Sequence, residues 1–469
     1  MKLTWETNVP DMSDFNSTLT SIQSFFQSGS TLPYEYRKGQ LELFRNAIIK
    51  YDDQINTALY DDLKKSKEET WATETGLLMS EINGAIKNLH KWMKPKKVPA
   101  DLVTFPSSAK IYRDPLGVVL IIAPWNYPLQ LSLIPLVGAI GGGNCAVLKP
   151  SELAPATEKI IIKIIEEIFP ENYVKVITGN GGEVVPAMIN NFHFDHIFYT
   201  GSITVGKEIY RLAAKDLVPV TLELGGKSPC IVYDDADIKV AAKRIVLGKF
   251  LNAGQTCVAP DYILIQQNAK DILLNELKDA IQKFYTDDPS SSYDYGKIIN
   301  ENRFNKLISY LDQEKIFYGG KSNKDMLYIE PTILINISLN DDVMKEEIFG
   351  PILPVLSFNT TQEAIRIVQQ NENPLSLYFF TKNRKTENEW IKKVPFGGGC
   401  INNTVWQFTN EHFPFGGVGN SGTGAYHGKN TFNVFTHDKP VLKTSTLIDP
   451  YLKYPPFKGK MKWFKRLIG

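Results

Sequence analysis

The sequence contains little cysteine and no long apolar run, and both shortages exclude classes of protein. Its cysteines form no CxxC pair, which predicts free thiols in a reducing compartment. The apolar run from Val118 to Ala123 ends at Pro124, far short of the roughly 20 residues that cross a bilayer. Residues 1–6 lack the apolar stretch of a signal peptide, so a cytoplasmic protein is expected. The four cysteines are Cys145, Cys230, Cys257 and Cys400.

Net charge is also nearly absent. The 52 Lys and Arg residues balance 51 Asp and Glu residues, so no overall field would hold nucleic acid or select an acidic partner. A metal site is not expected. Phe192 to Thr200 is predicted to be a strand, in which an offset of three places His193 and His196 on opposite faces. The 469 residues, 43% of them apolar, are enough for about three domains or lobes with a large core.

Strands alternate with helices along much of the chain. Residues 34–65 and 68–91 carry apolar residues at helical spacing, whereas 94–116, rich in proline, is predicted to form an extended ribbon. The alternation that follows predicts βαβ units and a parallel, doubly wound sheet, which binds ligands beyond the carboxyl ends of its strands. The predicted strands are 117–122, 145–148, 173–177, 196–200 and 218–222, and the helices between them are 129–140, 156–169, 183–190 and 205–214.

Three residues in unusual loops carry the groups that thioester chemistry needs. Glu223 opens a glycine-rich turn at 223–229, and Cys257 lies in a second small-residue loop at 254–260. Together they offer a nucleophile and a base that can later activate water. Asn126, flanked by rigid residues, is suited to donate a hydrogen bond to an oxyanion. Taken singly, a cysteine is more often a small buried hydrophobe and an asparagine a turn residue.

Two further loops offer groups to a nucleotide. Lys149 and Glu152 follow a predicted strand and present an ammonium and a carboxylate to a ribose; the alternative is a charged loop that caps a helix. Gly201, Ser202 and Gly206 belong to a small-residue segment that opens a helix, where backbone N–H groups would meet a pyrophosphate. Such segments are common, so this signal is weak alone.

Other motifs favour different functions less well. Residues 417–422 match GxGxxG, with Asp438 about twenty residues later, as in a dinucleotide fingerprint. No long helix follows them, so we expect a structural loop near the substrate entrance. A Cys–His hydrolase dyad would need His412, His427 or His437 as base, and nothing local favours any of them.

Five motifs follow one another along the chain: Pro124-Trp125-Asn126-Tyr127-Pro128, Lys149-Pro150-Ser151-Glu152, Glu223-Leu224-Gly225-Gly226-Lys227, Gly254-Gln255-Thr256-Cys257 and Glu346-Glu347-Ile348-Phe349-Gly350-Pro351. In this order they resemble the aldehyde dehydrogenase superfamily, and the resemblance covers nearly the whole chain. Residues 414–429 and 453–456 resemble its class 3 branch, which includes fatty aldehyde dehydrogenases. One departure is Ile203, where the family usually has Thr, so that hydroxyl contact is lost while the backbone role of the loop remains.

The resemblance implies an aldehyde dehydrogenase-like α/β fold, with two doubly wound parallel α/β domains and a β-ribbon oligomerisation arm. Residues 1–93 and 115–223 would form the NAD(P)-binding domain and 224–428 the catalytic domain. Residues 94–114 and 429–469 would form the bridging arm and the C-terminal tail. A homodimer is expected, since relatives with this fold are usually oligomeric.

The resemblance also implies NAD(P)-dependent oxidation of an aliphatic, fatty or aromatic aldehyde to a carboxylic acid. Cys257 would carry the thioester, Asn126 would stabilise the oxyanion and Glu223 would activate the hydrolytic water. No metal would be needed. Two alternatives stay open: a coenzyme A-acylating aldehyde dehydrogenase, against which Glu223 argues, and a binding or structural protein on the same fold.

For the cofactor, the resemblance places Glu347 on the nicotinamide ribose, Phe349 against that end of the cofactor, and Lys149 with Glu152 on the adenosine ribose. Trp125 is a further expected cofactor-binding residue. NAD is expected because the carboxylate of Glu152 repels a 2′-phosphate, with NADP as the alternative.

The C-terminal segment differs from the rest of the chain in its basic and aromatic composition. Residues 453–469 hold six basic side chains and no acidic one, interleaved with aromatic residues. This composition suits the surface of an anionic bilayer, and it predicts peripheral contact at the inner face of a membrane. The alternative is a tail that packs on the partner subunit of a dimer.

Overall fold

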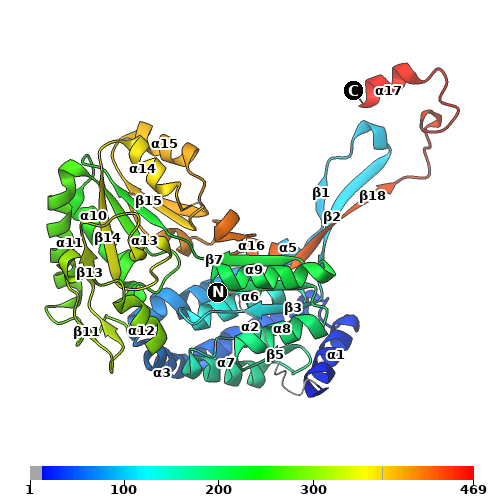
Figure 1. Ribbon diagram of the computed structural model, residues 1–469. Coiled ribbons are helices and arrows are strands. Elements are labelled where there is room, and N and C mark those ends of the chain that lie inside the picture. Colours follow the sequence, from blue (N-terminus) through cyan, green and yellow to red (C-terminus); the bar gives the residue numbers. More distant parts are fainter. Residues whose placement is uncertain (1–12, 372, 469) are drawn as a thin grey trace.

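The computed structural model describes residues 13–371 and 373–468, which build two α/β domains and an arm that projects from one of them (Figure 1). The sheet of the first domain has the strand order β17-β7-β6-β3-β4-β5, and all of its strands are parallel except β17. These strands are β3 (Val118–Ile122), β4 (Cys145–Lys149), β5 (Val174–Val176), β6 (His196–Gly201), β7 (Val220–Leu224) and β17 (Gly422–Thr423).

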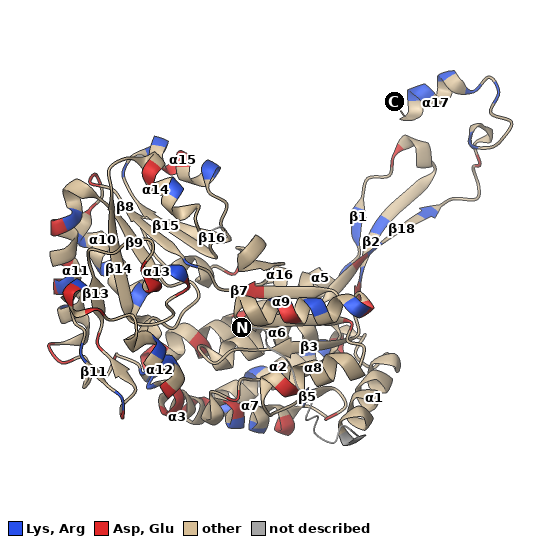
Figure 2. Ribbon diagram, in the orientation of Figure 1, with Lys and Arg blue, Asp and Glu red and all other residues tan. Residues whose placement is uncertain are grey.

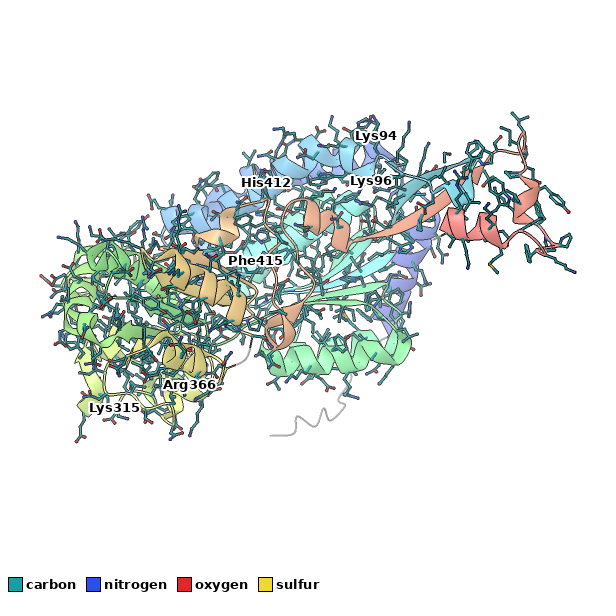
Figure 3. The ribbon with its side chains drawn as sticks, turned by 90° about the horizontal axis from the view of Figure 1, so that it is seen from above. Lys94, Lys96, Lys315, Arg366, His412 and Phe415 are labelled. Atoms are coloured by element: carbon teal, nitrogen blue, oxygen red, sulfur yellow. The ribbon has the colours of Figure 1, made fainter. Side chains whose placement is uncertain are left out.

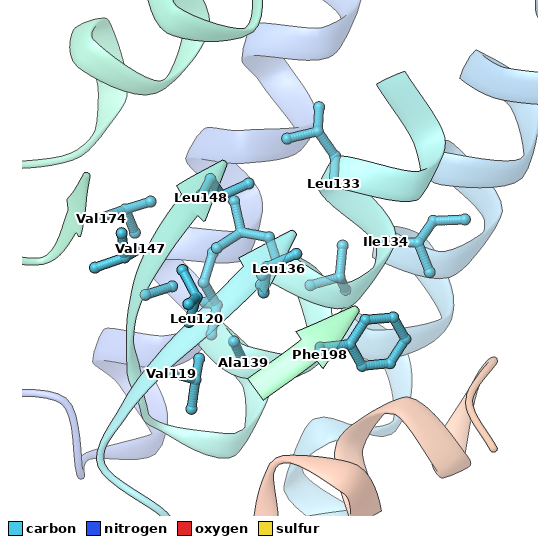
Figure 4. Close-up of a cluster of buried hydrophobic side chains, with 14 of the residues drawn as sticks. Val119, Leu120, Leu133, Ile134, Leu136, Ala139, Val147, Leu148, Val174 and Phe198 are labelled. Carbon is cyan, nitrogen blue, oxygen red and sulfur yellow. The ribbon is translucent and has the colours of Figure 1, made fainter. Parts of the chain in front are cut away.

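The core of the first domain lies between its central strands and α6 (Pro128–Gly142). Every residue of β3, β4 and α6 is buried, which explains why these segments are continuous apolar runs rather than amphipathic ones. Figure 4 shows Leu136 and Ala139 of α6 against Leu120 and Leu148 of the two strands. The other helices of this domain are α1 (Ser13–Gln27), α2 (Tyr34–Lys50), α3 (Asp52–Leu63), α4 (Lys67–Thr70), α5 (Gly76–Met93), α7 (Pro155–Ile168), α8 (Gly181–Asn191), α9 (Ile203–Ala213) and α16 (Lys429–Val434).

The second domain has a seven-stranded sheet of order β10-β13-β14-β9-β8-β15-β16, parallel except for β10. Its strands are β8 (Pro229–Val232), β9 (Tyr262–Gln266), β10 (Ile316–Tyr318), β13 (Thr332–Leu334), β14 (Ile352–Phe358), β15 (Ser376–Phe380) and β16 (Gly398–Ile401), beside a small pair of β11 (Ser322–Asn323) and β12 (Tyr328–Ile329). Its helices are α10 (Ile238–Phe250), α11 (Lys270–Tyr285), α12 (Glu301–Ile308), α13 (Asp342–Lys345), α14 (Thr361–Val368) and α15 (Arg384–Lys393).

The arm is a three-stranded antiparallel ribbon of β1 (Lys96–Val98), β2 (Ser107–Pro115) and β18 (Thr436–Thr444). After β18 the chain runs to the tip of the arm and ends in α17 (Met461–Ile468), which lies against the short turn Leu102–Thr104 (Figure 1). No helix among the described residues is both long and apolar enough to cross a membrane.

Two local expectations are wrong. Glu223 does not lie in a turn: pairing with Thr200 of β6 and Gly422 of β17 extends β7 through Leu224. The strand expected from Phe192 begins only at His196, because Phe192 caps α8 and its ring packs on Phe194 at 4.9 Å. The two rings are two residues apart in the sequence, which is the spacing of apolar side chains on one face of a strand.

The domain limits also differ from the expected ones near residue 428. The segment 422–423 joins the sheet of the first domain through β7, and Tyr426 belongs to the core of that domain. Helix α16, expected in the arm and tail, packs on α6 through the buried Phe432. The GxGxxG stretch at 417–422 therefore leads into a strand rather than a helix, unlike a dinucleotide fingerprint.

Candidate active site

A cleft of about 1200 Å³ opens between the two domains, and both contribute to its walls. Asn126 enters it from the loop between β3 and α6, Glu223 from the end of β7, and Cys257 from a turn before β9. The structure thus brings together three residues that lie far apart in the sequence, at positions 126, 223 and 257. Figure 3 views the two domains from above, with Phe415 labelled between them.

Left-handed backbone shapes the turn that carries Cys257. Asn252, Ala253 and Gly254 all have positive φ, at 52°, 50° and 74°, so the chain reverses sharply after α10. A Cβ on Gly254 would lie 2.3 Å from the carbonyl oxygen of Gly350, so only glycine lets the two loops approach this closely. The cysteine loop is consequently fixed against the 346–351 loop.

Asn126 is buried, and one of its two side-chain N–H groups already donates a hydrogen bond. Its Nδ2 donates to the Gln255 carbonyl at 3.1 Å, and no donor among the described residues reaches its Oδ1. The amide carries a second N–H, so one donor remains for a ligand in the cleft. Tyr127 ties the same loop to the cysteine loop, since its hydroxyl lies 2.7 Å from that of Thr256.

The electrostatics of the site favour neutral groups. Burial, followed by the carboxylates of Glu347 and Glu223, raises the pKa of Cys257 to about 12. Burial also raises the pKa of Glu223 well above its ordinary value, and neither of its carboxyl oxygens has a partner among the described residues. Burial, and after it the charge of Asp261, raises the pKa of Glu347 to about 8. A proton is therefore available to move among these groups without leaving the site.

A second cavity meets the cleft at Glu223 and Cys257. Burial lowers the pKa of its one histidine, His427, to about 4, so this imidazole is neutral near pH 7. The rest of the lining is mainly apolar and aromatic. It includes Tyr127, Leu131, Val258, Leu375, Phe408, Phe415 and Tyr426.

All of the predicted cofactor residues except Gly206 line the cleft or a neighbouring groove of about 1030 Å³. Lys149 lies in that groove with its Nζ 2.9 Å from Glu152. Burial opposes ionisation of Glu152, but the Gly181 N–H and Lys149 outweigh it and hold the pKa of this carboxyl below its ordinary value. Glu152 is therefore ionised, and it forms an ion pair with Lys149 in the groove.

Trp125 and Phe349 close the cleft from opposite domains, with ring centres 5.3 Å apart in an edge-on contact. Phe349 has a φ of 51°, an uncommon conformation for a bulky residue, and Glu347 lies two residues before it on the same loop. This strained loop presents both side chains to the cleft.

Of the glycine segment, Gly201 and Ser202 line both the cleft and the groove. Ser202 caps α9 by accepting from the Val205 N–H at 3.4 Å, so the helix N-terminus opens there. Gly206 lines neither. A Cβ at Gly206 would lie 2.6 Å from Leu224, so this glycine lets α9 approach β7.

Sequence reasoning missed several residues at the site. Arg303 of α12 lines the cleft with its guanidinium carbon 6.0 Å from the centre of the Phe349 ring, and no motif marks it. Phe408 and Tyr426 line the apolar cavity. Tyr426 lies in the class 3-like stretch 414–429, whose aromatic residues were a signal that could have pointed to this cavity, whereas Phe408 lies outside that stretch.

Comparisons with known proteins agree on one family. Residues 4–441 match the sequence model of the aldehyde dehydrogenase family. The chain is 46% identical to 4,4'-diaponeurosporen-aldehyde dehydrogenase of Staphylococcus aureus, with 94% of this chain and 96% of that protein covered. It is 42% identical to aldehyde dehydrogenase family 3 member H1 of Arabidopsis thaliana, with 97% and 94% covered.

A solved structure, the substrate-bound state of Staphylococcus aureus AldH, superposes with a TM-score of 0.95 at 45% identity, covering 97% of this chain and 99% of that one. The expected fold class and the class 3 resemblance are confirmed. The chain belongs to the aldehyde dehydrogenase family of oxidoreductases.

Proposed function

We propose that this protein oxidises an apolar aldehyde to a carboxylic acid through a thioester on Cys257. The observation that carries the proposal is the position of Cys257, with Glu223 beside it, at the junction of the open cleft and the apolar cavity. An aldehyde group at the inner end of the cavity would meet the thiol from one side. A cofactor in the cleft would approach it from the other.

In this mechanism the Sγ of Cys257 attacks the carbonyl carbon and an oxyanion forms. The free N–H of the Asn126 amide and the backbone N–H of Cys257 donate hydrogen bonds to that oxygen. Because the pKa of the Cys257 thiol is raised, its proton must leave during attack. A neighbouring carboxyl group can accept that proton only in its ionised form, and Glu223 must be ionised again before it activates water. Hydride loss from the carbon leaves the thioester.

Glu223 then acts as general base for the water that hydrolyses the thioester. A raised pKa makes this carboxylate a better base than an exposed one, and its two unpartnered oxygens are free to hold a water. Hydrolysis releases the acid and returns the proton to the thiol.

A nicotinamide dinucleotide in the cleft would supply the hydride acceptor. Lys149 and Glu152 would hold its adenosine ribose, the N-terminus of α9 its pyrophosphate, and Glu347 its nicotinamide ribose. The N-terminus of α9 at Ser202, which lines both the cleft and the groove, and the ionised carboxylate of Glu152 support this fit. The same charge favours NAD over NADP.

The apolar cavity supports aliphatic, fatty or aromatic aldehydes as substrates. The surface that its lining exposes is mainly apolar, which suits a hydrocarbon chain better than a sugar or a phosphorylated substrate. The related Staphylococcus aureus enzyme is named for 4,4'-diaponeurosporen-aldehyde, which agrees with an apolar substrate here.

The test is NADH production across aldehydes of increasing chain length, with and without coenzyme A. The proposal expects activity without coenzyme A that grows with the apolar length of the substrate and is abolished in Cys257→Ala. A strict requirement for coenzyme A would identify the acylating alternative. If the folded protein binds NAD but oxidises no aldehyde, the alternative of a binding or structural protein on the same fold would be supported.

The C-terminal tail supports a second proposal, peripheral association of a cytoplasmic homodimer with the inner face of a membrane. Helix α17 exposes 63% of Met461, 49% of Trp463 and 73% of Ile468, and Figure 2 shows basic and no acidic residues on it. It lies against the arm turn whose Leu102 is also exposed. Apolar and basic groups together suit an anionic lipid surface.

Sedimentation with anionic vesicles tests the tail, comparing the full chain with one that ends at Tyr454. Each basic residue near the lipid contributes roughly 1 kcal/mol, so binding should be lost at high ionic strength. If both proteins stay in the supernatant at low salt, the tail is structural. Sedimentation equilibrium of the same two proteins would then show whether it packs on the partner subunit.

A further inference from the structure

Beneath the Asn126 loop lies an ion pair that the proposed chemistry does not use. The side chains of Lys65 and Glu74 are fully buried, with Nζ and Oε1 2.6 Å apart. Lys65 comes between α3 and α4, and Glu74 lies on a π-helical turn, Trp71–Thr75, that leads into α5. π-Helical turns are rare in proteins, and those that occur are often found at functional sites.

Glu74 caps the helix that follows Asn126. Its second oxygen accepts from the N–H groups of Leu129 at 2.9 Å and Gln130 at 3.2 Å, in the first turn of α6. A carboxylate there satisfies free N–H groups and interacts favourably with the helix dipole. The start of α6, and the loop before it, is thereby fixed.

Lys65 fixes the loop itself. Its Nζ donates to the Asn126 carbonyl at 3.0 Å and lies 4.0 Å from the centre of the Tyr127 ring. With Glu74 as the third contact, all three donors of the ammonium have partners on the loop or its cap. Neither Lys65 nor Glu74 lines the cleft or the apolar cavity.

The same carbonyl is held from the second domain. The Nδ2 of Asn252 donates to the Asn126 carbonyl at 2.8 Å and to the Gln255 carbonyl at 3.1 Å, while the Nδ2 of Asn126 donates to that Gln255 carbonyl. Glu69 accepts from the backbone N–H of Asn252 at 2.8 Å. The Asn126 amide and the cysteine loop thus share one rigid network.

We propose that Lys65 and Glu74, together with Asn252, are positioning residues that hold the Asn126 amide at the oxyanion position relative to Cys257. The inference rests on the proposed function, because it assigns the network a role in the same reaction. Positioning matters here because a displacement of about 1 Å can cost about 100-fold in rate.

The test is a double-mutant cycle with Asn126→Ala. Lys65→Met alone would leave Glu74 as a buried unpaired charge, so the neutral pair Lys65→Met/Glu74→Gln is the variant of choice. In the wild-type background it should lower kcat about 10-fold to 100-fold while the KM for NAD changes little. In the Asn126→Ala background it should lower kcat less than about 3-fold further, because the amide it positions is already gone.

Asn252→Gly gives a second cycle that removes no charge. Glycine accepts the positive φ of this position, so the backbone is kept while both amide bonds are lost. Lys50→Met, which breaks the exposed pair with Glu167 on the outside of the same domain, is the matched control and should leave kcat unchanged. Thermal unfolding of every variant separates loss of stability from loss of rate.

Equal losses in the two backgrounds, in either cycle, would overturn the inference and leave these residues a role in stability alone. An unchanged kcat in the wild-type background would overturn it as well. If the wild-type protein itself oxidises no aldehyde, the proposed function fails. That outcome is distinct from an active enzyme with additive losses.

Discussion

Gly225→Ala should weaken the cofactor site without harming the fold. Gly225 follows β7 directly, two residues after Glu223, and it faces the loop that carries Glu347. A Cβ built there would lie 2.1 Å from one carboxyl oxygen of Glu347, 2.8 Å from its Cδ and 2.9 Å from the other oxygen. The atoms that must yield are the far end of a flexible side chain, so the carboxylate moves and the backbone stays.

The size of the effect follows from that contact. Carbon and oxygen need roughly 3.3 Å between them, so the carboxylate must shift by about 1 Å or turn away. If Glu347 holds the nicotinamide ribose, such a shift should raise the KM for NAD or lower kcat by about 10-fold to 100-fold. The KM for the aldehyde should change little, because the apolar cavity has neither residue in its lining.

The assay is steady-state NADH formation at varied NAD and fixed aldehyde, with Glu347→Ala and the double variant measured beside it. The double variant should match Glu347→Ala, because the added methyl group then has nothing to displace. Gly39→Ala is the matched control. Nothing lies within 4 Å of its Cβ, so helix α2 should gain up to about 1 kcal/mol while the kinetics stay the same. Wild-type kinetics in Gly225→Ala, or additive losses in the double variant, would refute the reasoning.

Three further predictions use the same protein. Glu223→Gln should give a single burst of NADH followed by a slow steady rate, and a normal steady rate would show that Glu223 is not the general base. Asn126→Ala should lower the rate of NADH formation about 10²–10³-fold in both phases. Because burial and two carboxyl groups raise the pKa of Cys257 to about 12, its alkylation by iodoacetamide should accelerate about tenfold per pH unit below that value, and Glu223→Gln should lower this pKa. A labelling rate that stays flat between about pH 7 and 9, measured by mass spectrometry, would contradict the raised pKa. Glu152→Gln should narrow the preference for NAD over NADP in kcat/KM, and an unchanged ratio would show that Glu152 does not select the cofactor.

Local patterns in the sequence were sufficient for the family and the fold. The alternation of apolar strands with helices predicted the parallel sheet of the first domain, because strands buried on both faces read as continuous apolar runs such as 118–122. Motif order predicted the family, which the comparisons confirm. The boundaries were less secure: β7 extends through Glu223 because partners on both sides continue the pairing, and pairing is not visible within a single segment.

Only the tertiary structure decided what supports the site. The chain order separates Lys65 from Asn126 and Asn126 from Asn252, and nothing in their spacing predicts that they share one carbonyl. The same holds for Arg303 and for the cavity that Phe408 and Tyr426 line. Motifs record the residues that do the chemistry, since the reaction demands particular groups. The residues that hold them depend on packing between distant segments, and that packing exists only in the folded chain.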